Sequence, residues 1–169
     1  MEDTIEISQE EEKRYAQLQA LALDFAREGN TFELAKMIDA GINVNLSTQK
    51  LDSLVMLASY NGNYETTKML IEKGADLDRV NQREQTPLEG VCFKGNLEIV
   101  KLLVENGAIF EGKAMVYASM FGHKEIVSYL KNQGVDKKSL TFLGINIEKL
   151  ASFTSFFKTF KNRFKKRSS

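Results

Sequence analysis

Hydrophobic and polar residues alternate along this chain at helical spacing, in short blocks that glycines separate. Residues 97–104 show the pattern best, with apolar side chains at Leu97, Val100, Leu103 and Val104. Glycine closes such blocks because it adopts the left-handed turn at a helix end at little conformational cost. The pattern therefore predicts a series of short amphipathic helices.

The separating glycines recur at fixed intervals. One series repeats every 33 residues: Gly29, Gly62 and Gly95. A second series has the same interval and lies 12 residues later: Gly41, Gly74 and Gly107. A fourth pair, Gly122 and Gly134, begins 27 residues after Gly95, so the connection before it is six residues shorter. Each unit is predicted to be a helix-turn-helix that cannot bury its apolar faces alone, so neighbouring units must stack.

The third unit carries Thr86-Pro87-Leu88 followed by GNLEIVKLLVENGA, and in this it resembles the ankyrin repeat. The resemblance covers residues 18–136. It implies an all-α solenoid of about four repeats, to which the sequence adds an N-terminal capping helix and, after the repeats, a C-terminal basic amphipathic helix. The repeat boundaries expected are 18–45, 46–78, 79–111 and 112–136. Glu89 stands where the family usually has a histidine that braces the turn between repeats, which implies a weaker or differently satisfied turn.

A narrower resemblance rests on LVMLASYNGNYETTKMLIEKGAD and on the segment from Thr86 to Gly95. These are similar to a group of small bacterial single-domain ankyrin proteins, some of which are associated with catalase and proposed to help supply its haem. The resemblance implies catalase as a partner and haem as a ligand. Haem iron would need a tyrosine or histidine ligand, and the candidates are Tyr60, Tyr117 and His123. No other cofactor is expected.

The ankyrin resemblance also implies binding through the concave side, which is formed by the first helix of each repeat and by the loop tips. The repeat register places these residues toward the groove: Asp24, Arg27, Leu57, Tyr60, Gly90, Phe93, Tyr117 and Met120, with Phe121 nearby. Gly90 would leave a gap beside Phe93, which predicts a pocket. Exposed aromatic side chains are frequent binding hot spots, so the sequence predicts an adaptor that binds another protein. The alternative is that the rings only fill space between helices.

The loop tips would add a polar rim to this groove: Gln49, Lys50, Asp52, Arg79, Asn81, Gln82, Arg83 and Glu84. Arg79 and Arg83 are its candidate partner contacts. The alternative interpretation of the whole rim is a set of solvated turns.

Before the repeats, residues 1–17 form an acidic segment and the start of a helix. Ser8 and Glu11 have the spacing of a capping box, which predicts one helix over residues 9–28. An apolar stripe along it is predicted to pack on the first repeat: Tyr15, Leu18, Leu21, Ala22 and Phe25.

Charge is distributed unevenly along a chain whose net charge is zero. Residues 1–12 carry six acids and no bases, and residues 148–169 carry seven bases and one acid. The 23 acids and 23 bases of the chain therefore leave residues 13–147 with 16 of each. The two ends are oppositely charged around a neutral middle.

The segment 137–169 departs from the repeat pattern. Apolar residues recur every three or four positions: Ile147, Leu150, Phe153, Phe157, Phe160 and Phe164. The predicted basic amphipathic helix has three interpretations, namely a cap on the fourth repeat, a helix on an anionic membrane surface, and a docking helix for a partner. Its candidate contact residues are Phe157, Lys158, Phe160, Lys161, Phe164, Lys165 and Lys166. Nucleic acid is disfavoured because the repeats are neutral and carry no base-reading motif.

Motifs of catalysis are missing from the sequence. It contains no Walker A loop, GxGxxG, HExxH or GxSxG. A single Cys and a single His argue against a self-contained zinc site or a histidine-based triad, so Cys92 and His123 are interpreted as structural residues. We expect no enzyme activity and no catalytic or metal-binding residues. With no secretory signal and no long apolar run, the expected location is the cytoplasm, with attachment to the inner membrane face as the alternative.

Overall fold

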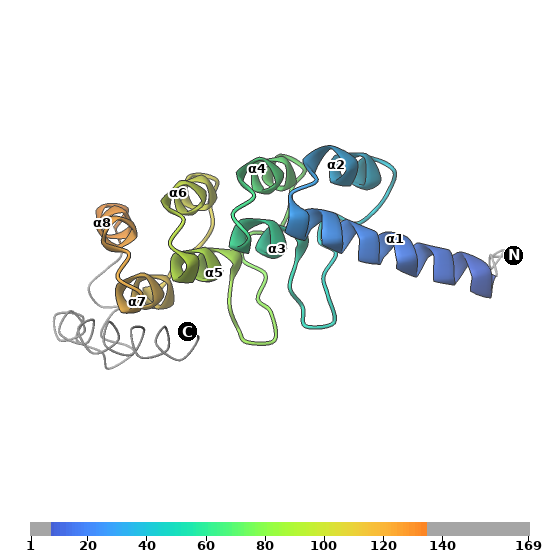
Figure 1. Ribbon diagram of the computed structural model, residues 1–169. Helices are drawn as coiled ribbons and strands as arrows, with labels where there is room; N and C mark the ends of the chain where they lie inside the picture. The colour runs from blue at the N-terminus through green and yellow to red at the C-terminus, as the bar shows by residue number, and fades with distance from the viewer. Residues whose placement is uncertain (1–7, 135–169) are drawn as a thin grey trace, which may run out of the picture.

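A computed structural model of the chain describes residues 8–134, which form α-helices in two stacked rows (Figure 1). The inner row contains α1 (Gln9–Glu28), α3 (Leu54–Tyr60), α5 (Pro87–Lys94) and α7 (Gly112–Met120). The outer row contains α2 (Thr31–Asp39), α4 (Tyr64–Glu72), α6 (Leu97–Glu105) and α8 (Lys124–Asn132). Each inner helix contacts its outer partner and the next inner helix, and the described residues contain no strand. The predicted all-α solenoid of stacked helical pairs is confirmed.

The recurring glycines set the turns of this solenoid. All eight have positive φ angles, from +77° at Gly122 to +109° at Gly41. Residues with a Cβ reach this region only with strain, so glycine at these positions ends each helix and reverses the chain. The prediction that both series mark helix ends is confirmed.

Two long loops extend from the helices, one after α2 and one after α4 (Figure 1). In the first loop Ser47 and Ser53 form an isolated antiparallel bridge. The connection from α6 to α7 is much shorter, as the shortened interval before Gly122 predicts. Long loops therefore connect the first repeat to the second and the second to the third, but not the third to the fourth.

One hydrophobic core runs through all the stacked units. Its largest fully buried side chains come from both rows: Leu34, Leu54, Leu70, Leu88, Ile99, Leu103, Met115, Ile126 and Leu130. Because each outer helix contributes to the same core as its inner partner, no unit closes its core alone. Stacking is thus the source of stability, as expected for a repeat protein.

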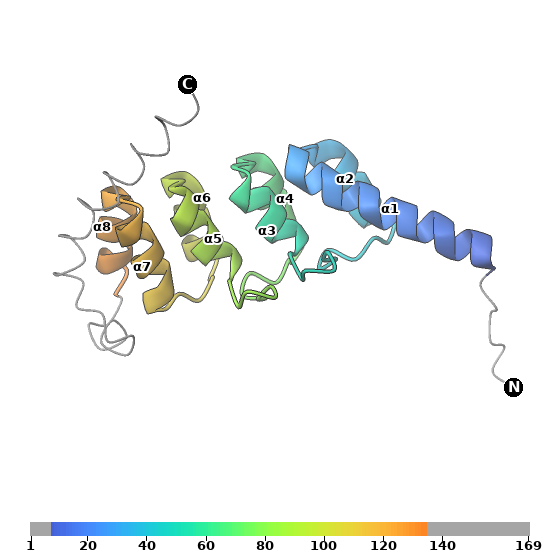
Figure 2. The same cartoon turned by 60° about the horizontal axis from the view of Figure 1, so that its bottom comes forward.

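Helix α1 behaves differently from the other helices, because it extends beyond the stack (Figure 2). The predicted capping box is present, with Ser8 accepting from the Glu11 amide and Glu11 accepting from the Ser8 amide. Ala22 and Ala26 are buried against the repeats, but every residue from 9 to 18 is exposed. The predicted packing of three stripe residues is wrong: Tyr15, Leu18 and Leu21 are 48%, 41% and 43% exposed. The reason is length, since α2 and α3 have 9 and 7 residues and cannot cover a helix of 20.

Candidate functional site

Three aromatic rings from consecutive repeats form a continuous row on the inner helices. The Tyr60 and Phe93 rings are stacked, with centroids 6.3 Å apart and an angle of 9° between planes. Phe93 and Phe121 meet edge to face at 4.4 Å and 66°. Tyr60 is 39% exposed, Phe121 is 44% exposed, and Phe93 between them is half-buried. We call Tyr60, Phe93 and Phe121 the aromatic row.

The repeat register explains why these rings meet. Tyr60 is the last residue of α3, Phe93 lies in the last turn of α5, and Phe121 directly follows α7. Equivalent positions of stacked repeats lie side by side, so large side chains there come into contact. The register places Met120 in line with Tyr60 and Phe93, but the ring that contacts Phe93 belongs to the next residue. Met120 remains exposed beside it.

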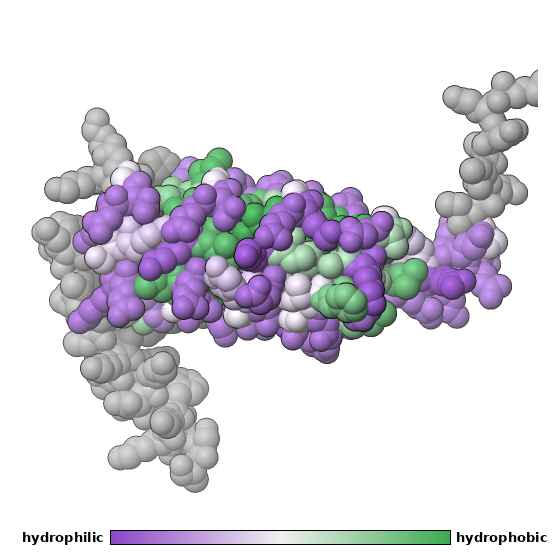
Figure 3. All heavy atoms as spheres, turned by 90° about the horizontal axis from the view of Figure 1, so that it is seen from above, coloured by the Kyte–Doolittle hydropathy of each residue, from purple (hydrophilic) through white to green (hydrophobic). Residues whose placement is uncertain are grey.

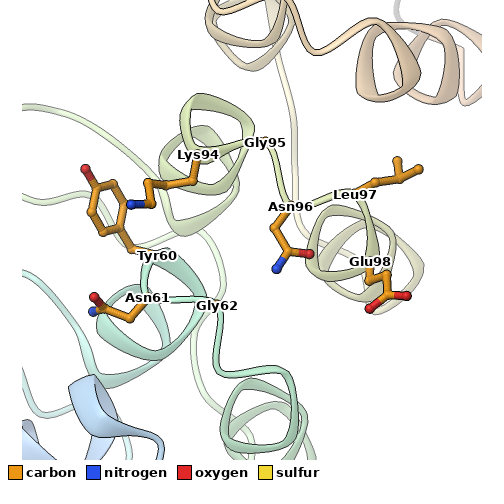
Figure 4. A pocket seen from close by; sticks show the side chains of 8 residues that line it. All are labelled: Tyr60, Asn61, Gly62, Lys94, Gly95, Asn96, Leu97 and Glu98. Atoms are coloured by element: carbon orange, nitrogen blue, oxygen red, sulfur yellow. The ribbon is translucent and has the colours of Figure 1, made fainter. Parts of the chain in front are cut away.

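A cation and a cavity adjoin the aromatic row. The ammonium nitrogen of Lys94 lies 5.0 Å from the centroid of the Tyr60 ring, within the range of a cation–π contact. Figure 4 shows Lys94 beside this ring, at one side of an open cavity of about 400 Å³ between the second and third repeats. The cavity is lined by Tyr60, Asn61, Gly62, Lys94, Gly95, Asn96, Leu97 and Glu98. The site therefore offers an aromatic surface next to a positive charge and amide groups.

The pocket predicted at Gly90 is not found there. Gly90 is buried, and a Cβ at this position would lie 3.3 Å from Cδ2 of Tyr60. The Tyr60 ring thus fills the space that the missing side chain leaves. The expectation that Gly90 lines a pocket and contacts a partner is wrong, because the cavity lies at the turn after α5 instead.

The other predicted groove residues are partly buried or paired within the protein. Leu57 and Tyr117 are half-buried, and the Tyr117 hydroxyl accepts a hydrogen bond from Nε2 of Gln85 at 3.2 Å. Asp24 and Arg27 are exposed but paired with each other. The exposed aromatic surface of the predicted groove is therefore concentrated at the aromatic row.

The predicted polar rim divides into exposed and structural residues. Most members are exposed at the loop tips: Gln49, Lys50, Arg79, Gln82, Arg83 and Glu84. Arg79 also donates a hydrogen bond to the carbonyl oxygen of Asn45 at 2.9 Å. Asn81 is only 7% exposed, so its assignment to the rim is wrong. Its amide donates to Oδ1 of Asp52 at 2.8 Å and accepts from the Arg83 amide at 2.9 Å, which joins the two loops.

Two of the three candidate haem ligands are hydrogen-bonded within the protein, and the third is held by ring stacking. Nε2 of His123 donates to the carbonyl oxygen of Phe93 at 3.0 Å, since a carbonyl can only accept. Tyr117 is bonded to Gln85, and Tyr60 is stacked on Phe93. Haem binding at these residues stays a prediction.

The side chain of His123 makes a contact between repeats, at a different helix from the one it precedes. It makes no side-chain cap on α8 and instead reaches back to the end of α5. Asn63 reaches back in the same way, donating to the carbonyl oxygens of Ala26 and Arg27 at 3.0 and 2.9 Å. Asn63 was missed from the sequence, although a polar residue directly after Gly29, Gly62, Gly95 and Gly122 was the available signal.

Cys92 and Glu89 are buried in the third repeat. Burial, and secondarily the charge of Glu89, raises the pKa of the Cys92 thiol to about 12, so it stays protonated at neutral pH and is a poor nucleophile. Glu89 accepts from the Thr86 amide and Thr86 accepts from the Glu89 amide, a capping box that satisfies the turn without a histidine. Within residues 8–134 no group of three or more His, Cys, Asp or Glu side chains is placed to hold a metal ion.

The predicted C-terminal helix, with its contact residues from Phe157 to Lys166, lies outside the described residues, as do residues 1–7. Among the helices that the structure describes, none has the length and apolarity needed to cross a membrane.

Comparison with known proteins agrees with this architecture. A family model described as "Ankyrin repeats (3 copies)" matches residues 23–112 and 55–141, together more than half of the chain. The Pseudomonas aeruginosa protein named "Putative ankyrin repeat protein PA3287" is 44% identical over 45 residues, which cover 27% of this chain and 26% of that protein. The human ASB11 ankyrin repeat domain superimposes with a TM-score of 0.63 and 30% identity, covering 68% of this chain and 54% of that one. The chain thus spans only part of each relative, about half of one and a quarter of the other. By its repeats, its fold and these matches, the chain belongs to the ankyrin-repeat family.

Proposed function

We propose that this protein is a non-enzymatic adaptor that binds one partner protein through the aromatic row and the neighbouring loop tips. Ankyrin repeats are generally protein–protein interaction modules and typically lack enzyme activity, which supports the class. The particular surface is our inference from the geometry of Tyr60, Phe93 and Phe121.

The observation that carries the proposal is that two large rings remain exposed although they contact a third. Tyr60 and Phe121 each keep more than a third of their surface accessible while Phe93 fixes their positions. Rings held by stacking lose little conformational entropy when a partner covers them, which favours their use as binding anchors. Lys94 adds a charged group at the edge of the same surface.

The outer helices look less suited to this role. Figure 3 views the molecule over the outer row and shows mainly hydrophilic residues, with hydrophobic residues exposed in small groups. Phe32 on the outer helix α2 is 69% exposed and lies under the ammonium of Lys36. Phe32 is a useful reference because it is an exposed aromatic side chain away from the aromatic row.

The experiment compares three full-length proteins as baits in the lysate of the source organism: the parent, Tyr60→Ala with Phe121→Ala, and Phe32→Ala. Captured proteins are identified by mass spectrometry, and circular dichroism confirms that each bait is folded. We expect one protein to be retained by the parent and by Phe32→Ala and to be lost with the double variant. Equal capture by all three baits would refute the aromatic row as the binding surface. Because the catch is identified without assuming a class, recovery of catalase would support the narrower family resemblance.

A further inference from the structure

A second unpartnered surface lies on α1, away from the aromatic row. Residues 9–18 are all exposed because the helix extends past the repeats (Figures 1 and 2). Tyr15, Leu18 and Leu21 are exposed together, and helical spacing places neighbours three or four residues apart on one face. Large apolar side chains grouped on a projecting helix indicate a contact surface.

This surface also carries negative charge at its free end. Glu10, Glu11 and Glu12 are exposed in the first turn of α1, and Glu11 is four residues before Tyr15, on the same face. The seven residues before the described part add three more acids in the sequence, Glu2, Asp3 and Glu6. The exposed bases Lys13 and Arg14 follow Glu12, so the sequence from 1 to 14 holds six acids against two bases. A partner for this face should therefore combine an apolar stripe with positive charge.

The chain itself contains a segment of matching chemistry. Between 148 and 169 the sequence has seven bases and one acid. Phe157, Phe160 and Phe164 have helical spacing, and Lys158, Lys161 and Lys165 follow them one residue later each, so the basic stripe would border the apolar one. At 1.5 Å per residue, the stripe from Phe157 to Phe164 would span about 10 Å, close to the roughly 9 Å from Tyr15 to Leu21.

The position of α1 favours binding of residues 148–169 to another copy of the chain over binding to α1 of the same copy. Helix α1 projects from one end of the stack and α8 closes the other end of the described part (Figure 1). A segment that follows α8 begins at the end remote from the face of α1. We propose that residues 148–169 of one copy bind the exposed face of α1 in a second copy, joining copies head to tail. This contact goes beyond the adaptor function, since it leaves the aromatic row free.

The test measures the mass of the full-length protein by analytical ultracentrifugation over a range of protein and salt concentrations. We expect the mass to rise above the monomer value of 19.1 kDa with increasing concentration, and the association to weaken in high salt because it depends on charge. A mass that stays at the monomer value at every concentration in low salt would overturn the proposal, whether the segment then binds its own copy or a membrane.

Charge reversal in the full chain tests the two surfaces. One variant carries Glu10→Lys and Glu12→Lys, which spares the capping residue Glu11, and another carries Lys158→Glu, Lys161→Glu and Lys165→Glu. Each should weaken association at least tenfold, while Glu65→Lys with Glu72→Lys on the outer helix α4 should leave it unchanged. Association that is unchanged in either the α1 variant or the C-terminal variant would overturn the proposal, and so would an equal loss in the α4 control, which would show that the effect does not depend on these two surfaces.

Discussion

The imidazole of His123 donates from Nε2 to the carbonyl oxygen of Phe93, 3.0 Å away and 30 residues earlier in the chain. The ring lies over Gly95, where a Cβ would stand only 2.2 Å from Cε1 of the imidazole. Asn63 makes the equivalent contact between the second and first repeats, over Gly29. A polar side chain directly after the turn glycine thus ties each of these two repeats to the one before it.

Replacing His123 by alanine should lower the free energy of unfolding by about 1 kcal/mol, the usual net value of one hydrogen bond. His123→Asn is the matched control, because Asn63 shows that an asparagine can make this contact between repeats. Urea denaturation should rank the parent above His123→Asn and His123→Asn above His123→Ala. Equal stability of the parent and the alanine variant would show that the contact does not stabilise the stack.

Gly95→Ala should destabilise the protein more than Gly62→Ala. Both glycines have nearly the same φ, +87° and +85°, so the backbone strain of roughly 1–2 kcal/mol is shared. Only at Gly95 would the new methyl group collide with the His123 ring, since the nearest atom at Gly62 is 3.8 Å away. The excess cost should therefore disappear when both alanine variants are compared in a His123→Ala background. An excess that persists without the imidazole would contradict this explanation.

Much of the fold follows from the sequence because its signals are local. Glycines such as Gly62 and Gly95 mark turns through a backbone requirement that few other residues meet, and they do so at a regular interval. The signal for the start of α1 is equally local, because Ser8 and Glu11 each accept a hydrogen bond from the backbone amide of the other within one turn. Such features need no knowledge of neighbouring repeats.

The errors concern relationships between elements. The apolar stripe predicted which face of α1 is turned to the repeats. It could not reveal that α2 and α3 are too short to cover Tyr15 and Leu18 on that face. The repeat register located the aromatic row, but it put Met120 in line with Phe93 and could not show that the side chain of Phe121 makes the contact instead. Asn81 looked like an exposed polar tip, because its burial depends on Asp52 in the preceding loop. These outcomes depend on the lengths and relative positions of neighbouring units, which a sequence pattern does not contain.

Asn81→Ala should be among the more destabilising loop substitutions, with a loss of about 2–3 kcal/mol. The buried amide accepts from the backbone amides of Arg83 and Gln85 at 2.9 and 3.2 Å and donates to Asp52 at 2.8 Å. Asn81→Asp keeps the acceptor but places a second carboxylate against Asp52, so it should cost more at neutral pH than at pH 4. Denaturant unfolding at both pH values measures this. A mild effect of Asn81→Ala would mean that water replaces these bonds readily.

Leu51 and Glu84 occupy equivalent positions 33 residues apart, and both have positive φ angles, +63° and +55°. Because this region is strained for residues with a Cβ, Leu51→Gly should be about 1 kcal/mol more stable than Leu51→Ala. Both substitutions remove the same partly exposed side chain, so their difference isolates the backbone. Thermal unfolding of the pair, repeated at Glu84, checks the expectation. Equal stability of the glycine and alanine variants would argue that these loops relax to another conformation.

Glu89 should make stability depend on pH in the direction opposite to that of a salt-bridged carboxylate. Burial raises the pKa of its carboxyl above the ordinary value, and the hydrogen bond from the Thr86 amide opposes this only in part. Folding therefore favours the protonated form of Glu89. The stabilising contribution of this group is full below about pH 4, where the glutamate of the unfolded chain is also protonated. It is lost as the pH rises through the raised pKa of the folded state.

Glu89→Gln keeps an oxygen that can accept from the Thr86 amide and removes the buried charge. This variant should gain stability relative to the parent as the pH increases from 4 to 8, and the gain should level off once Glu89 of the folded parent is ionised. Denaturant unfolding of both proteins across this range measures the difference, in which the titration of the other carboxyls cancels. Glu98→Gln on the exposed face of α6 is the control and should follow the parent. A difference between Glu89→Gln and the parent that is constant with pH would show that burial does not shift the ionisation of this group.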